Sequence, residues 1–207
     1  MLLNPRTANQ RTFINMLYSN TPIVIGHGPA GTGKTLMAAY IGAHRLARGE
    51  FQKIVMTRPT VSVDEQLGFL PGSMQKKMDP WVTPIFDAFK KYYSPKQIKN
   101  LVENGAIEIC PLGFMRGRTF DKTYFICDEM QNSTPSQMQM AITRIGEDTK
   151  IIITGDPRQH DRGFENNGLV DLVDRCTHED YIEHVKFIDT DVQRNKYIQR
   201  VLEMYAK

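Results

Sequence analysis

The stretch GHGPAGTGKT, residues 26–35, holds the most informative pattern in the chain. From Gly28 onward it matches the phosphate-loop pattern G-x-x-x-x-G-K-[ST] in full, and a chance match in a chain of this length has a frequency on the order of 1%. Glycines let consecutive backbone N–H groups curl around phosphates, while Lys34 would reach the β- and γ-phosphates and the Thr35 hydroxyl would bind Mg²⁺. We therefore predict that nucleotide phosphates are bound by Gly28, Pro29, Ala30, Gly31, Thr32, Gly33, Lys34 and Thr35.

The loop lies between a predicted strand and a predicted helix, the context that phosphate binding requires. Residues 22–27 form a short apolar run stopped by glycine, and residues 35–49 repeat apolar side chains at helical spacing. The other predicted strands cover residues 53–59, 106–110, 123–128, 150–156 and 183–189, and the predicted helices between them include 135–146 and 165–175. This alternation predicts a single α/β domain over residues 1–207, a three-layer parallel sheet covered by helices.

Composition favours an ordinary globular protein. Of the 207 residues, 41% are hydrophobic and 24% are charged, and no apolar run approaches the ~18–20 residues of a membrane span. The N-terminus becomes polar after three residues, so we expect no secretory signal, and three widely spaced cysteines favour a reducing cytoplasm. The net charge of +3 is compatible with nucleic-acid binding but does not indicate it alone.

Residues 58–104 depart from the strand–helix alternation. The segment LGFLPG at 67–72 predicts turns, and the prolines after Asp79 and Thr83 offer two possible helix starts. A packed helix face is the favoured interpretation of the apolar stripe that follows, and the alternative is a surface for a partner or a single strand of nucleic acid. The stripe consists of Trp81, Ile85, Phe86, Phe89, Tyr92 and Tyr93.

A second motif, FICDE at residues 125–129, is an apolar strand that ends in two acids. In phosphate-loop enzymes an acid at a strand end organises the Mg²⁺ shell, which is the role predicted for Asp128. A carboxylate one residue further on can orient and deprotonate an attacking water, which suits Glu129. Two such acids can also cap a helix, but beside a phosphate loop the catalytic interpretation is favoured. A dedicated base indicates hydrolysis rather than a kinase or a switch.

Three further residues are candidates for the site. Gln159 follows the strand-like run at 151–154, where it could sense the γ-phosphate or position water, although on spacing alone a simple Gly-Asp-Pro turn is the favoured interpretation of the segment. Gln10 could bind adenine through its amide, which is both donor and acceptor. Arg194 could neutralise γ-phosphate charge in the transition state. On their own, Gln10 and Arg194 are more simply interpreted as surface residues.

Taken together, these motifs resemble those of the PhoH family of ATPases, which are relatives of the superfamily-one helicases. The matching stretches follow the family's order along the whole chain, and LGFLPG and MRGRTF are the most specific of them. They are NQRTFI (9–14), GPAGTGKT (28–35), TRPTV (57–61), LGFLPG (67–72), DP (79–80), PLGFMRGRTF (111–120), DEMQN (128–132), TPSQMQMAITRIG (134–146), TGDPRQ (154–159) and DVQRN (191–195).

The resemblance implies a RecA-like P-loop NTPase core that hydrolyses ATP with Mg²⁺. It assigns the phosphate and metal roles to Lys34, Thr35 and Asp128, and the catalytic glutamate to Glu129. It places Gln159 at the γ-phosphate sensor, Gln10 at the adenine-binding glutamine and Arg194 at the late arginine. Arg58 matches a motif that lies towards nucleic acid in related helicases.

The chain departs from the family pattern in two respects. The late motif is DVQRN, where the family commonly has histidine after the arginine, which makes Arg194 the least secure of these assignments. The chain has no nuclease-like addition and is shorter than many members, which favours a phage or compact bacterial version.

Chain length also bears on assembly, because superfamily-one helicases bind ATP between two RecA-like domains and only one fits here. A complete site then needs an arginine from the same chain or from a neighbouring subunit. We expect a homo-oligomer, most simply a hexameric ring, with Arg194 or Arg144 near the shared site. The favoured function is an ATPase that binds or remodels single-stranded nucleic acid, RNA before DNA, supported by arginines 116, 118, 144, 158 and 162. The alternatives are an ATP-dependent module that acts on a protein partner and a phosphate-loop kinase, against which Glu129 argues.

Overall fold

The fold is built on a parallel β-sheet whose central strands are mostly apolar. The computed structural model describes residues 3–59, 85–159, 167–176, 179–193 and 204. Within them, six strands pair in parallel in the order β3-β2-β4-β5-β1-β6. The strands are β1 (Ile23–His27), β2 (Lys53–Thr57), β3 (Ile107–Ile109), β4 (Thr123–Cys127), β5 (Lys150–Gly155) and β6 (Ile182–Lys186).

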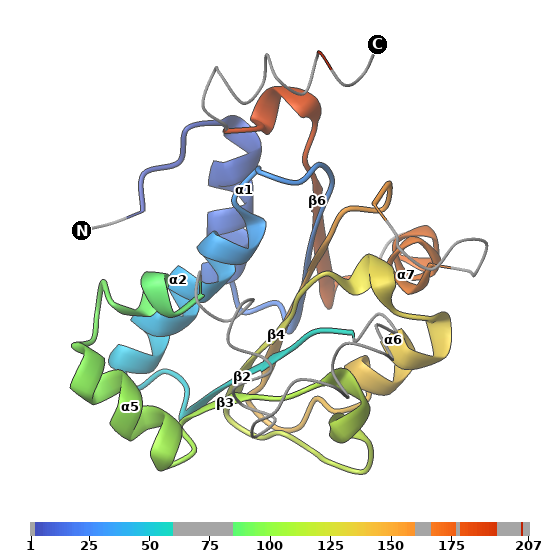
Figure 1. Cartoon of the computed structure of the whole chain (residues 1–207). Coiled ribbons are helices and arrows are strands. Elements are labelled where there is room, and N and C mark those ends of the chain that lie inside the picture. The colour runs from blue at the N-terminus through green and yellow to red at the C-terminus, as the bar shows by residue number, and fades with distance from the viewer. Residues whose placement is uncertain (1–2, 60–84, 160–166, 177–178, 194–203, 205–207) are drawn as a thin grey trace.

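Helices cover both faces of this sheet and make three layers (Figure 1). Helices α1 (Ala8–Tyr18), α2 (Lys34–Ala47) and α5 (Pro95–Glu103) lie on one face, and α6 (Pro135–Ile142) and α7 (Gly168–Arg175) lie on the other. Three short 3₁₀ turns, η1 (Leu112–Met115), η2 (Met130–Asn132) and η3 (Asp189–Asp191), follow β3, β4 and β6. The predicted three-layer α/β fold is therefore confirmed.

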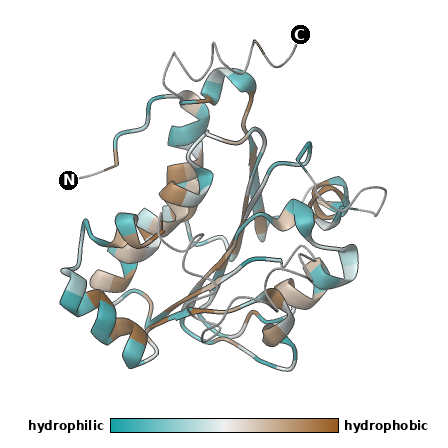
Figure 2. Ribbon diagram, viewed as in Figure 1, coloured by the Kyte–Doolittle hydropathy of each residue, from teal (hydrophilic) through white to brown (hydrophobic). Residues whose placement is uncertain are grey.

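Alternation along the strands divides the apolar core between the two faces. On β1, Val24 packs into the core beneath α1 and α2, whereas Ile23 and Ile25 pack into the core beneath α6 and α7. The same alternation separates Ile152 of β5 from Ile151 and Ile153. Because both faces are covered, the central strands are mostly apolar, with polar residues near their ends, and Figure 2 shows brown along much of their length.

All six predicted strands are present, with ends that differ from the prediction by no more than three residues. The predicted helices at 35–49, 135–146 and 165–175 correspond to α2, α6 and α7. Helix α1 was not predicted. It begins after Thr7, whose hydroxyl caps the helix by accepting from the Gln10 backbone N–H.

The apolar stripe is packed in its described part. Ile85 and Phe89 are buried in the core beneath α2 and α5, and Phe86, Tyr92 and Tyr93 pack against that core. This arrangement confirms the packed-face interpretation for these residues. Trp81, the LGFLPG turn and both predicted helix starts lie outside the described residues.

Strand order brings three loops to one edge of the sheet. Strand β5 lies between β1 and β4, so the segments that follow these three strands emerge next to one another at their carboxyl ends. Ligands bind at this edge in open α/β sheets. The phosphate loop follows β1, the acids Asp128 and Glu129 follow β4, and Asp156 follows β5.

Candidate functional site

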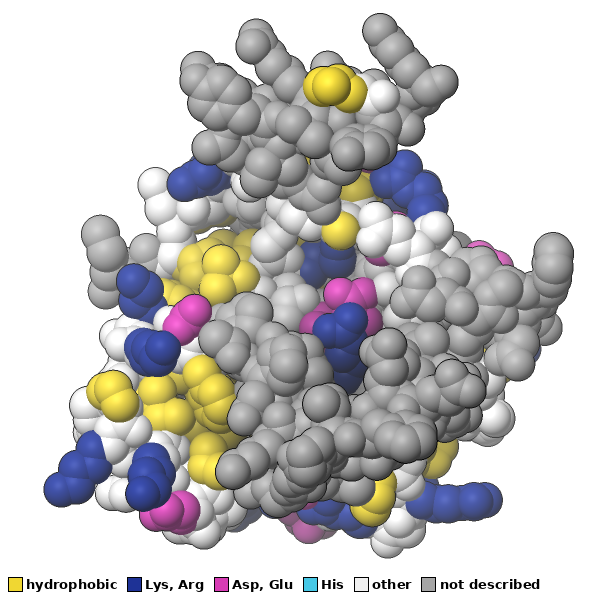
Figure 3. Space-filling model, in the orientation of Figure 1, with side chains coloured by type: hydrophobic (Ala, Val, Ile, Leu, Met, Phe, Trp, Pro, Cys, Tyr) yellow, Lys and Arg dark blue, Asp and Glu magenta, His cyan; other side chains and the backbone are white. Residues whose placement is uncertain are grey.

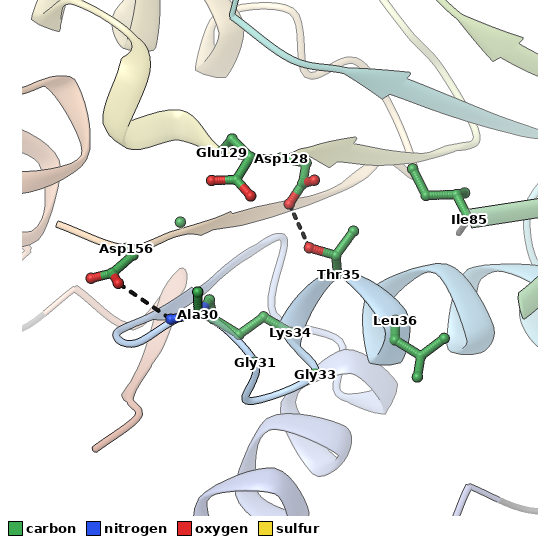
Figure 4. A pocket seen from close by; sticks show the side chains of 11 residues that line it. Ala30, Gly31, Gly33, Lys34, Thr35, Leu36, Ile85, Asp128, Glu129 and Asp156 are labelled. Carbon is green, nitrogen blue, oxygen red and sulfur yellow. Dashed lines mark hydrogen bonds between the residues drawn. The ribbon is translucent and has the colours of Figure 1, made fainter. Parts of the chain in front are cut away.

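A cavity of about 330 Å³ lies at this carboxyl edge, between the loop after β1 and the ends of β4 and β5. In Figure 4 the carboxylates of Asp128, Glu129 and Asp156 face the loop that carries Lys34. The cavity is lined by Ala30, Gly31, Gly33, Lys34, Thr35, Leu36, Ile85, Asp128, Glu129, Gly155 and Asp156. Most of the predicted phosphate and metal residues therefore lie around one space.

The start of the phosphate loop requires glycine for two reasons. Gly28 has a φ of +129°, a conformation that residues with a side chain rarely adopt. A Cβ at this position would also collide with the carbonyl oxygen of Phe187, which follows β6. The Gly28 N–H donates to the Gly155 carbonyl oxygen over 3.1 Å, so the loop is attached to the end of β5. The glycine in the motif thus serves the packing of three adjacent chain segments as well as the loop's own conformation.

Lys34 points into the loop rather than towards solvent. Its Nζ donates to the carbonyl oxygens of Gly28 and Pro29 over 2.7 and 2.8 Å, and to the Thr32 hydroxyl over 3.2 Å. Burial lowers the pKa of the Lys34 ammonium, while the carboxylates of Asp156 and Glu129 act in the opposite direction. The Lys34 ammonium therefore lies inside the loop, where the oxygens of a bound phosphate could take the place of the Gly28 and Pro29 carbonyl oxygens.

Thr35 and Asp128 meet across the cavity. The Thr35 hydroxyl donates to Asp128 Oδ1 over 2.6 Å, and the Thr154 hydroxyl of β5 donates to the same oxygen over 2.6 Å. Asp128 is only 6% exposed, so both of its hydroxyl partners are aimed at a buried carboxylate. Thr154 was not predicted, although its place at the end of a predicted strand could have identified it.

The Thr35–Asp128 pair fits Mg²⁺, a hard cation that takes oxygen ligands. No group of three or more His, Cys, Asp or Glu side chains that could hold a metal occurs among the residues that the structure describes. A magnesium ion here would therefore take its remaining ligands from nucleotide phosphates and water, as is usual for Mg²⁺ in phosphate-loop sites.

Glu129 is held in an unusual backbone conformation. Its φ is +52°, in the left-handed region that side-chain-bearing residues enter at an energetic cost, often at functional sites. Its Oε2 accepts from Gln131 Nε2 over 2.5 Å, and its Oε1 lies 3.9 Å from Arg58 Nη2. The carboxylate is thus contacted on both oxygens, by residues from η2 and from the end of β2.

The segment after β5 contributes Asp156 to the cavity rather than Gln159. Asp156 is 4% exposed, and its Oδ2 accepts from the Ala30 N–H of the loop over 3.2 Å. Gln159 is exposed and does not line the cavity, and its backbone N–H closes a turn onto the Asp156 carbonyl oxygen. The turn interpretation therefore describes this segment, and the sensor role of Gln159 stays a prediction. Asp156 could have been found from its position as the acidic last residue of the strand predicted at 150–156.

Both ends of the described chain reach the phosphate loop. Gln10 is buried, and its Nε2 donates to the Thr32 carbonyl oxygen over 3.0 Å, while its Oε1 accepts from the Arg6 N–H. From the other end, the Gln193 N–H donates to the Gly31 carbonyl oxygen over 3.0 Å. Gln10 thus contacts the loop, and its role at the adenine stays a prediction. Arg194, the residue after Gln193, lies outside the described residues.

These two ends are also joined to each other. Asn9 Nδ2 donates to Asp191 Oδ2 over 2.7 Å, and the same carboxylate oxygen accepts from the Ile188 N–H over 2.9 Å. The pKa of Asp191 is below its usual value, because these hydrogen bonds outweigh the opposing effect of burial. The N-terminus of α1 and the η3 turn therefore form one support beside the loop.

The arginines of the predicted cluster that the structure describes contact different parts of the chain and do not gather at one site. Arg118 forms a bidentate ion pair with Glu108. The hydrogen bonds from Arg118 and from Lys53 lower the pKa of the Glu108 carboxyl to about 2. Arg144 donates to the carbonyl oxygens of Met140 and Arg118. Both arginines therefore stabilise the fold, and neither lines the cavity among the described residues.

Of the remaining arginines of the cluster, the two that the structure describes are exposed. Arg158 pairs with Asp189 over 2.9 Å, Arg116 is exposed, and Arg162 lies outside the described residues. In Figure 3 acidic and basic side chains lie against one another near the middle of the face shown. The described arginines thus do not form one uninterrupted basic surface.

Comparison with known proteins identifies the family. A family model described as PhoH-like protein matches residues 2–206, nearly the whole chain. The chain belongs to the PhoH-like protein family. The predicted resemblance is therefore confirmed, and the sheet and loop are those of a P-loop nucleotide-binding core.

Individual PhoH-like relatives match at substantial identity. A PhoH-like protein of Bacillus subtilis is 42% identical over 204 residues, which cover 98% of this chain and 63% of the relative. One of Mycobacterium tuberculosis is 39% identical over 206 residues, covering 99% of this chain and 58% of the relative. The protein PhoH of Escherichia coli is 36% identical over 188 residues, covering 89% of this chain and 53% of the relative. The chain thus spans between 53% and 63% of the length of these relatives.

The part of this PhoH-like chain that the structure describes contains no helix that could span a membrane. None of its helices there combines the length and the apolar character that crossing a bilayer demands.

Proposed function

We propose that this PhoH-like chain binds ATP with Mg²⁺ and hydrolyses it. The observation that carries the proposal is the meeting, around one cavity, of a complete phosphate loop and two acids. Asp128 contacts the Thr35 hydroxyl, and Glu129 lies beside it at the strand end with its carboxylate facing the loop. A kinase or a switch has no need for the second acid.

Four residues that line the cavity have individual roles in this proposal. Lys34 exchanges its bonds to loop carbonyls for the β- and γ-phosphates, and the loop N–H groups bind phosphate oxygens. Thr35 and Asp128 hold Mg²⁺, which when bound neutralises developing phosphate charge. Glu129 accepts a proton from the attacking water as its oxygen bonds to the γ-phosphorus, while the bond from that phosphorus to the β–γ bridging oxygen breaks and ADP leaves. Gln10 of α1 donates to the Thr32 carbonyl oxygen of the loop, and it is assigned to the adenine by the family resemblance.

Single-stranded nucleic acid is the second part of the proposal, with RNA favoured over DNA. Its main support is the helicase-like order of motifs, which is an argument by analogy. The structure also supports this part of the proposal, because contacts connect the exposed surface of η1 to Glu129 in the cavity. Arg58, at the end of β2, lies 3.9 Å from Glu129, and its carbonyl oxygen accepts from the Leu112 N–H of η1. On η1, Phe114 is 59% exposed and is followed by the exposed Arg116, a pairing suited to stacked bases and phosphates.

We expect single-stranded RNA to increase the steady-state rate of ATP hydrolysis several-fold at low salt, and single-stranded DNA less so. The increase should fall as salt rises, because phosphate contacts release counterions. The measurement is turnover with and without each strand at two salt concentrations, with duplex of the same sequence as the control. No binding of either strand at low salt would contradict the nucleic-acid proposal and favour an ATP-dependent module that acts on a protein.

We also propose that the chain assembles as a homo-oligomer, most simply a hexameric ring. One core of this kind leaves one side of the nucleotide open to a neighbour. The contacts of Arg144 with its own chain favour Arg194, which follows the loop-bound Gln193, as the arginine of the shared site. Sedimentation at micromolar concentration should show an assembly larger than a monomer in the presence of ATP and Mg²⁺. A monomer with and without nucleotide would contradict this proposal.

We infer a cytoplasmic location, the host cytoplasm if the protein is viral. Cys110, Cys127 and Cys176 are all free thiols in the structure, which agrees with a reducing compartment.

A further inference from the structure

Gln131 connects the candidate base to the loop after β5. It lies in η2, two residues after Glu129, and is 3% exposed. Its Nε2 donates to Glu129 Oε2 over 2.5 Å, and its Oε1 accepts from the Asp156 backbone N–H over 3.1 Å. Both ends of this amide are therefore used, and both partners line the cavity.

The partners of Gln131 determine which way its amide faces. The Asp156 N–H can only donate, so the amide oxygen must face it. The amide nitrogen then faces Glu129, whose ionised carboxylate can only accept. A flipped amide would bring two donors together at one end and two acceptors together at the other. The orientation is thus decided by chemistry and does not depend on distinguishing oxygen from nitrogen.

Two backbone features make room for this arrangement. A Cβ on Gly155 would lie 2.5 Å from Gln131 Oε1, so the glycine at the end of β5 provides the space for the amide. Glu129 itself adopts a left-handed backbone, with a φ of +52°. An unfavourable conformation persists where surrounding contacts hold it in place, and the bond from Gln131 is the shortest contact that Glu129 makes in the described structure.

We propose that Gln131 is a positioning residue that holds the Glu129 carboxylate in the direction needed to take a proton from water. This inference rests on the proposed ATP hydrolysis. A glutamate side chain has several rotatable bonds, and a general base works only when it is within hydrogen-bond reach of the proton it removes. Arg58 is 3.9 Å away and partly exposed, so it restrains the carboxylate less than Gln131 does.

The same residue links Glu129 to the phosphate loop. Gln131 binds the Asp156 N–H, and the Asp156 carboxylate in turn accepts from the Ala30 N–H. The position of the base is therefore connected through two residues to a loop N–H that lines the cavity.

Two substitutions separate the contacts of Gln131. Gln131→Glu keeps an acceptor for the Asp156 N–H but places a second carboxylate against Glu129, whereas Gln131→Met removes both hydrogen bonds at similar volume. We expect kcat for ATP to fall about tenfold or more in both variants, with Gln131→Glu at least as slow as Gln131→Met. The Kd for ATP should stay within about threefold of the wild type, because Gln131 does not line the cavity.

The controls identify what each result means. Gln139→Glu, on the exposed side of α6, makes the same chemical change away from the site and should leave kcat unchanged. Melting temperatures of all variants show whether a loss of rate follows from a loss of fold. If kcat falls in Gln131→Met but stays at the wild-type value in Gln131→Glu, the contact with Glu129 is not what matters, and the proposed role of Gln131 is contradicted. Losses of kcat, ATP binding and stability that run in parallel would also contradict it. A wild-type chain that binds ATP without hydrolysing it would overturn the proposed function and this inference with it, whereas an active wild type with active Gln131 variants overturns this inference alone.

Discussion

Replacing Glu129 with glutamine is expected to reduce kcat for ATP hydrolysis on the order of 100-fold or more while ATP remains bound. General-base catalysis contributes about 10²–10⁴-fold, and glutamine has nearly the same shape but cannot accept the proton. Since Gln131 can still donate to the amide oxygen of the new side chain, the local structure should be retained. Turnover and the Kd for ATP, measured side by side, test this expectation.

Glu103→Gln is the matched control for this experiment. Glu103 is exposed on α5 and pairs only with Lys99 over 3.7 Å, so its loss should not change turnover. A Glu129→Gln variant that hydrolyses ATP at the wild-type rate would refute the role of Glu129 as the base. Loss of ATP binding together with turnover would instead assign Glu129 to ligand binding.

Replacing Lys34 with alanine is expected to remove most of the stabilisation that ATP gives to the fold. At a ligand concentration 100 times Kd, binding stabilises a protein by about 2.7 kcal/mol, which for a chain of this size raises Tm by roughly 5–10 °C. If the substitution weakens binding about 100-fold, the same ATP concentration would raise Tm by only about 1 °C. Thermal unfolding with and without ATP and Mg²⁺ measures the difference.

The Tm of Lys34→Ala is measured without nucleotide as well, so that a change in the stability of the fold is told apart from a change in ATP binding. Lys34 is a buried ammonium whose pKa is lowered by burial, so removing it does not remove an exposed surface charge. Lys99→Met on α5 provides the control, because Lys99 is exposed and distant from the loop. An ATP-induced rise in Tm that is the same in Lys34→Ala and in the wild type would show that Lys34 does not bind the nucleotide.

Much of the fold follows from local patterns in the sequence. Short apolar runs such as 150–156, with polar segments between them, can be buried on both faces only in a helix-covered parallel sheet, and β5 occupies that run. The phosphate loop was predictable for the same reason, since Gly28 and Lys34 act within a single turn of chain. Asp128 and Glu129 were found because they end a strand directly after its apolar residues.

What sequence spacing could not show is which distant segments lie together. Gln131 and Asp156 are 25 residues apart, Ala30 and Asp156 are 126 apart, and Asn9 and Asp191 are 182 apart. These pairs exist because β5 is inserted between β1 and β4 and because β6 returns beside β1. Strand order is a global property of packing, and the apolar pattern of each strand is compatible with several orders.

The sequence by itself therefore determined that this chain is an α/β protein with a phosphate loop and two acids at a strand end. The tertiary structure alone decided that Asp156 lies at the loop, that Gln159 is exposed, and that the Gln131 amide meets the Asp156 N–H. The physical reason is that helix and strand patterns depend on neighbours within a few residues. Contacts such as Ala30–Asp156 and Gln131–Asp156 depend instead on the order of the strands, because only the assembled sheet brings these residues within reach of one another.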